Sequence, residues 1–178
     1  MRHGVRAVLP AGLLVTLLVA PTAGCAVGEA HRSTGEVAAA VQSAGEQAGS
    51  AVATVRLSVE LLGDGGLSLT ATDTAQSDQL EVLEAAERTL TTMSPPDAAT
   101  GAARDATLTA VQQATRAVVA AGGWITASGG RSTTERDAVP HDVVADLDAA
   151  QDALDEAITQ AAEAGTAPDA ADATAGAS

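Results

Sequence analysis

The chain has 178 residues, which is enough for one ordinary domain with tails but not for two. All nine basic residues are arginine and face 23 acidic residues, so the formal charge is −14. The absence of lysine excludes a P-loop lysine, a lysine Schiff base and a lysine general base. The acidity, together with a single aromatic residue, argues against nucleic-acid binding.

The first 24 residues have the pattern of a secretory signal peptide. Arg2 and Arg6 precede an uncharged, largely apolar run over residues 8–20. This run is too short to cross a bilayer as a helix, for which about 20 residues are needed. Small residues follow the run, and the chain becomes polar from residue 28. We therefore predict that residues 1–24 direct export and are then removed.

A short motif, Pro21-Thr22-Ala23-Gly24-Cys25, ends this segment. It resembles the lipobox of bacterial lipoproteins, in which small residues precede a cysteine that is thioether-linked to diacylglycerol and becomes the mature N-terminus. The resemblance implies cleavage after Ala23-Gly24 and lipidation of Cys25, which would anchor the protein to the outer face of the cell membrane. Cys25 is the only cysteine, so an internal disulfide is excluded. The alternative is a secreted chain with a free thiol or an intermolecular disulfide at Cys25.

Charge and composition divide the remaining chain into a tether, a domain and a tail. Without the first 24 residues, seven arginines face 23 acidic residues and the formal charge is −16, so anionic headgroups would repel the domain. Residues 25–35 are small and polar enough to act as a tether, and residues 36–164 would form the domain. Residues 165–178 contain nothing apolar larger than alanine and predict a disordered tail.

Helical periodicity is clearest in the first of four segments, over residues 34–62. Small and apolar residues recur there at an average of about 3.6 positions, the repeat of an α-helix. Ser33 or Thr34 is the expected N-cap, and the Gly-rich residues 63–66 are the expected end. Gly45 and Gly49 either weaken this helix or allow close contact with another. The predicted buried stripe is Val37, Val41, Ala44, Ala48, Val52, Val55, Val59 and Leu62.

Two further segments are expected over residues 73–93 and from 96 to about 121. Thr72 or Asp73 would cap the former, which the following prolines would stop. Gly122-Gly123 would interrupt the latter, although Trp124 and Ile125 would allow a further turn. The connection over residues 122–139, which contains Trp124, would be unusually long. Their predicted stripes are Leu80, Leu83, Ala86, Leu90 and Met93, then Ala103, Leu108, Ala110, Val111, Ala114, Ala117, Val118 and Ile125.

The fourth segment covers residues 140–164, with Pro140 at its first helical position and Gly165 as its cap. Its predicted stripe is Val144, Leu147, Leu154, Ile158 and Ala161. Four amphipathic segments predict an all-α fold, an antiparallel up-down four-helix bundle. Its core should be thin, because 43 residues are alanine, which forms helices well but buries little area.

Candidate binding residues are few and lie mainly in the fourth segment. Two pairs of aspartates, Asp142/Asp146 and Asp148/Asp152, are each four residues apart, so their like charges repel along one side of a helix. A divalent cation, a basic partner or plain solvation would offset this repulsion. Trp124, the only aromatic residue, would either anchor a partner or fill the end of the bundle.

Catalytic and metal-binding patterns are missing from the sequence. His141 lies beside an aspartate but lacks the nucleophile motif of a hydrolase, so a surface position is the expected role. Zinc, di-iron, EF-hand and haem-attachment motifs are absent, and Met93 fits core packing better than haem ligation. No cofactor or metal is therefore predicted.

The expected function is that of a non-catalytic interaction or structural module of the cell envelope, with an envelope protein as partner. The alternative is a binding module for a cationic ligand, a divalent metal or a basic partner. An envelope hydrolase that uses His141 is the third hypothesis.

Overall fold

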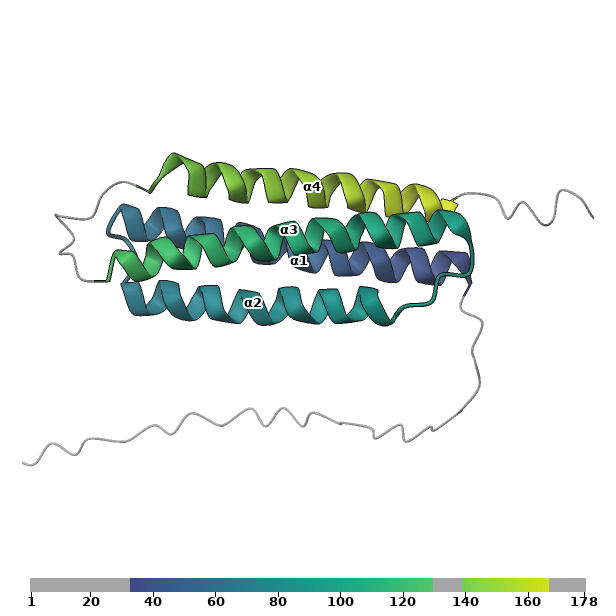
Figure 1. Cartoon of the computed structure of the whole chain (residues 1–178), viewed down its shortest axis with the longest axis horizontal. Helices are drawn as coiled ribbons and strands as arrows, with labels where there is room; N and C mark the ends of the chain where they lie inside the picture. Colours follow the sequence, from purple (N-terminus) through teal and green to yellow (C-terminus); the bar gives the residue numbers. More distant parts are fainter. Residues whose placement is uncertain (1–32, 130–138, 167–178) are drawn as a thin grey trace, which may run out of the picture. The chain divides into compact units, whose positions relative to one another are not determined.

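The computed structural model describes residues 33–129 and 139–166, and these form four helices without a strand. Consecutive helices run in opposite directions (Figure 1), which confirms the predicted all-α, up-down four-helix bundle. The predicted signal peptide, Cys25 and most of the C-terminal tail lie outside the described residues. The helices are α1 (Thr34–Gly63), α2 (Leu69–Thr92), α3 (Ala98–Ala127) and α4 (His141–Thr166).

Local sequence accounts for both ends of α1. Ser33 Oγ accepts a hydrogen bond from the backbone N–H of Glu36, and the Ser33 N–H donates to Glu36 Oε2 at 2.9 Å, which forms a capping box. At the other end, Gly65 adopts a positive φ of 74°, which glycine tolerates without steric cost. The predicted stripe of α1 is buried throughout.

The beginning of α2 differs from the prediction. The helix starts at Leu69, one turn earlier than expected, and Ser68 caps it by accepting a hydrogen bond from the N–H of Ala71. Neither Thr72 nor Asp73 is the cap. Thr72 is fully buried, and its hydroxyl donates to the Ser68 carbonyl, so the extra turn places a satisfied polar group inside the bundle.

The end of α3 also differs from the prediction, because the helix continues through Gly122-Gly123 to Ala127. Burial accounts for this: Ile125 is 1% exposed, and Gln76 of α2 packs over Gly122. Tertiary contacts therefore offset the weak helix propensity of two glycines, which is about 1 kcal/mol each. The connection to α4 consequently begins after Ala127 rather than at Gly122.

In α4, the capping predictions at both ends were wrong. Pro140 precedes the first helical residue, and its carbonyl accepts from the backbone N–H of Val144 at 3.4 Å. Gly165 lies within the helix, where a Cβ would come 2.9 Å from the Cβ of Ala38 in α1. This glycine permits a close approach of two helices and does not terminate one.

The buried stripe of α4 is also turned slightly relative to the prediction. Val143 and Ala157 are buried, while Val144 and Ile158 are half-buried. The direction from which α1 and α3 cover α4 decides which neighbouring residue is enclosed. Leu80 of α2 is likewise half-buried against the core.

Helices α1 and α3 each contact all three other helices. Helices α2 and α4 do not contact each other and lie on opposite sides of the α1–α3 pair (Figure 1). The close approach to α4 depends on glycine: a Cβ on Gly45 would lie 2.7 Å from Ile158 Cγ1, and one on Gly49 would lie 3.2 Å from Gln151 Nε2. Of the two roles considered for Gly45 and Gly49, close helix contact is confirmed.

Candidate functional site

The four aspartates proposed as a ligand face do not converge in the structure. Asp148 faces α1, where its Oδ1 lies 3.0 Å from Arg56 Nε. Arg56 also lies 3.3 Å from Glu60, so one guanidinium joins carboxylates of two helices. These side chains are almost half exposed, so the ion pairs contribute little to stability, but they neutralise Asp148.

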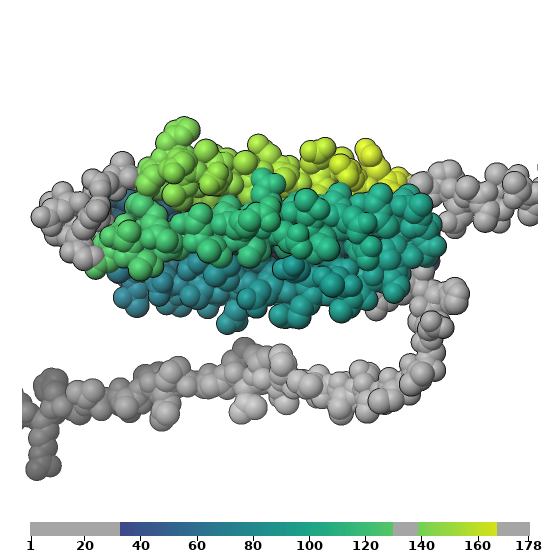
Figure 2. All heavy atoms as spheres, viewed as in Figure 1, coloured from purple at the N-terminus to yellow at the C-terminus, as the bar shows by residue number. Residues whose placement is uncertain are grey.

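Asp146 lies on the other side of α4, beside residues of α3. Helices α3 and α4 are neighbours along their length (Figure 2). Asp146 lines a shallow hollow of about 350 Å³ together with Gln113, Arg116 and three alanines. Arg116 has no carboxylate within 4.0 Å among the described residues, so the hollow contains two opposite charges that do not touch.

Asp142 and Asp152 are exposed. The described part of the chain contains no cluster of three or more acidic, histidine or cysteine side chains suited to hold a metal ion. The structure therefore separates the predicted acidic face into residues directed toward α1, residues near α3 and residues open to solvent. Cation binding through these aspartates stays a prediction.

Trp124 packs against the core from the last turn of α3 and remains partly exposed. Ser128 Oγ donates to the Trp124 carbonyl at 2.9 Å, which secures the end of that helix. Met93 is 7% exposed and belongs to the core, and His141 is exposed at the first residue of α4. Trp124 and Met93 thus occupy the packing positions that were considered for them.

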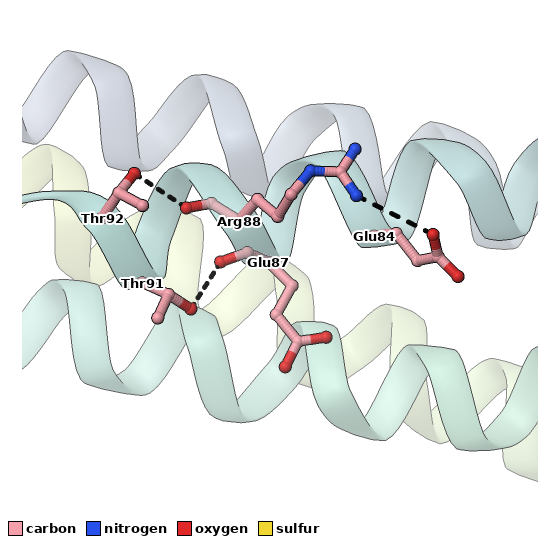
Figure 3. A pocket seen from close by; sticks show the side chains of 5 residues that line it. All are labelled: Glu84, Glu87, Arg88, Thr91 and Thr92. Carbon is pink, nitrogen blue, oxygen red and sulfur yellow. Dashed lines mark hydrogen bonds and ion pairs between the residues drawn. The ribbon is translucent and has the colours of Figure 1, made fainter.

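A second shallow hollow lies on α2, and the lining residues drawn in Figure 3 all belong to that helix. Its ion pair, between Arg88 and Glu84 at 3.8 Å, is about two-thirds exposed on both sides. Thr91 and Thr92 donate their hydroxyls to backbone carbonyls one turn earlier, so neither offers a free donor to a ligand. We assign no function to this hollow.

A junction that sequence analysis missed joins the N-termini of α1 and α3. Thr34 Oγ1 donates to Asp97 Oδ2 at 2.8 Å, while Asp97 Oδ1 accepts from the backbone N–H of Thr100 at 2.8 Å. Chiefly the Thr100 N–H, and then the Thr34 hydroxyl, lower the pKa of Asp97 from its ordinary value. The sequence indicated that a helix begins near Asp97, but its partner is 63 residues away.

The outer face of α1 exposes leucine, which sequence analysis also missed. Leu57 and Leu61 are 56% and 38% exposed, whereas every other leucine of the described residues is buried or half-buried. They are four residues apart and lie off the buried stripe, a spacing that would have identified them. Val119 on α3 is exposed to 55% but has no large apolar neighbour of this kind.

Comparison of the chain with protein-family models, curated protein sequences and solved structures finds no match. In the described part of the chain, no helix is both long enough and apolar enough to span a membrane.

Proposed function

We propose that this protein is a lipid-anchored, extracytoplasmic interaction module without catalytic activity. The anchor part of the proposal rests on the motif over residues 21–25, with Cys25 as the lipidated residue. Helix α1 begins at Thr34, so a tether of nine residues, 25–33, would connect the lipid to the bundle. The Thr34–Asp97 hydrogen bond would secure the bundle where the tether joins it.

The observation that supports an interaction role is the exposed pair Leu57 and Leu61. Exposing two leucines on one helix face leaves apolar area in water, at a cost of about 25 cal/mol per Å² that a partner surface would remove. The remaining surface is strongly acidic, since the described residues include 18 acidic side chains and four arginines. The leucines are therefore the surface best suited to a protein partner.

The length of the bundle would determine where this surface lies relative to the membrane. A helix of 30 residues is about 45 Å long, and Leu57 and Leu61 are near the end of α1 that is distant from the tether. The acidic surface would keep the bundle away from anionic headgroups. The leucines would thus be presented to other proteins and not to lipid.

Membrane fractionation of a Cys25→Ser variant tests the anchor. The unaltered chain should remain in the membrane pellet after a high-salt wash, and the variant should be released. Val27→Ser, which introduces a serine two residues further along the tether and leaves the cysteine intact, is the matched control and should pellet normally. Pelleting of Cys25→Ser after the same wash would refute lipid anchoring.

A further inference from the structure

We infer that the outer face of α1 is a self-association surface, on which α1 of a second copy packs in parallel. The surface, called here the outer stripe, follows steps of four, three, four, three and four residues. All its members are exposed and uncharged. They are Ser43, Gln47, Ser50, Thr54, Leu57 and Leu61.

The outer stripe has the spacing of a two-stranded coiled-coil seam, and its last two members are apolar. An alternation of three and four residues averages 3.5, the period at which one line of side chains keeps facing a partner helix. Leu57 and Leu61 would provide the apolar contact, and the smaller residues would allow the helix backbones to approach closely. A groove between α1 and α2 lies beside the stripe, and Gln79 and Val82 form its α2 side.

Hydrogen bonds within α1 already pair some of the polar groups of the outer stripe. Gln47 Nε2 donates to Ser43 Oγ at 3.2 Å, and Thr54 Oγ1 donates to the Ser50 carbonyl at 2.8 Å. Buried polar groups are costly chiefly when they lack a partner. These hydrogen bonds lie within α1 and would persist in the dimer.

The charges beside the stripe favour the parallel orientation. Glu46 and Glu60 each precede a stripe residue on one edge, whereas Ala51 and Ser58, which follow stripe residues on the other edge, are buried within the bundle. In a parallel pair, one edge of each helix meets the opposite edge of its partner, so the edges that carry Glu46 and Glu60 do not meet each other. An antiparallel pair would bring Glu46 near Glu60 of the second copy, where like charges repel.

The anchor gives an independent reason for parallel packing, and this step rests on the proposed function. Two copies held at residue 25 in one membrane would have the N-termini of their α1 helices on the same side. Confinement to a membrane also raises the effective concentration of each copy for the other. A modest seam with two leucines would then suffice for association.

Disulfide trapping in membranes tests this inference. Leu57→Cys places a thiol in the seam, and Val119→Cys places one on α3 at matched exposure, 55% against 56%. Mild oxidation of the full chain should produce about tenfold more covalent dimer from Leu57→Cys than from Val119→Cys, because the seam holds paired residues together. An antiparallel pair centred on the stripe would separate the two residues 57 by about 15 Å, beyond disulfide reach.

The unaltered chain shows how much dimer Cys25 forms by itself, and pelleting of the same samples reports the anchor. Excess dimer from Leu57→Cys in pelleted chains supports both proposals. Pelleting without excess dimer overturns self-association and leaves the anchor proposal intact. Excess dimer in chains that do not pellet overturns the anchor proposal and supports self-association. Failure of both measurements refutes both. A Leu57→Asp, Leu61→Asp variant should also stop cross-linking by a carboxylate-reactive bifunctional reagent, which the lysine-free chain requires, whereas Val119→Asp should not.

Discussion

Replacing glycine by alanine at two positions is expected to change the stability of the bundle in opposite directions. Gly45 lies in the interface between α1 and α4, and a Cβ there would come 2.7 Å from Ile158 Cγ1 and 3.5 Å from Thr107 Cγ2. Gly123 is on the exposed side of α3, and a Cβ there would meet no atom within 4 Å. The same chemical change therefore meets a packed neighbour at one position and solvent at the other.

The magnitudes follow from two opposing contributions. Alanine stabilises a helix interior by about 0.5–1 kcal/mol relative to glycine, which is the whole expected effect of Gly123→Ala. At Gly45 the added methyl must displace Ile158 or separate the helices, and such overpacking costs about 1–3 kcal/mol. The free energy of unfolding should therefore rise by about 0.5–1 kcal/mol for Gly123→Ala and fall by about 1 kcal/mol for Gly45→Ala.

Urea unfolding followed by far-ultraviolet circular dichroism measures both changes. A double-mutant cycle with Ile158→Ala separates the clash from other effects, because Gly45→Ala should become stabilising once the isoleucine is removed. If Gly45→Ala stabilised the unaltered chain as much as Gly123→Ala does, the close contact between α1 and α4 would be wrong. If Gly45→Ala lowered the free energy of unfolding equally with Ile158 present and with Ile158→Ala, the destabilisation would not arise from contact with Ile158.

Three further predictions concern caps and charges. Folding lowers the pKa of Asp97, so the ionised carboxylate stabilises the fold fully when the pH is above the pKa of the unfolded chain. This stabilisation is lost as the pH falls through the lower pKa of the folded chain. Asp97→Asn should therefore reduce the dependence of the free energy of unfolding on acid below about pH 4. Ser33→Ala removes the capping box and should lower the free energy of unfolding by about 1 kcal/mol in a urea titration. If Asp142 and Asp146 bind a cation, millimolar calcium should raise the melting temperature of the unaltered chain but not of a double Asn variant, and an unchanged melting temperature would end that hypothesis.

Periodicity and capping chemistry predicted most of the fold. The stripe of α1 was predicted at every position, since apolar residues recur at the helical repeat, and Ser33 was one of the two expected N-caps. Helix ends were harder to predict, because Gly122 and Gly165 suggest breaks locally. Both glycines lie inside helices, where contacts with Gln76 and Ala38 require a residue without a side chain.

The candidate site was less predictable for the same reason. Spacing placed Asp146 and Asp148 together in an acidic segment, but two residues apart on a helix means opposite sides. Only the positions of α1 and α3 show that Asp148 meets Arg56, while Asp146 shares a hollow with Arg116. The Thr34–Asp97 junction likewise joins residues that no local pattern relates.

The sequence by itself determined that the chain is acidic, lacks lysine and has helical segments rich in alanine, because charge and periodicity are properties of residue order. Tertiary structure alone decided which glycines end a helix and which allow a second helix to approach closely. It also decided which carboxylates are paired and that Leu57 and Leu61 face outward. These outcomes depend on which surfaces of separate helices come within a few ångströms of each other, and residue order does not specify that distance.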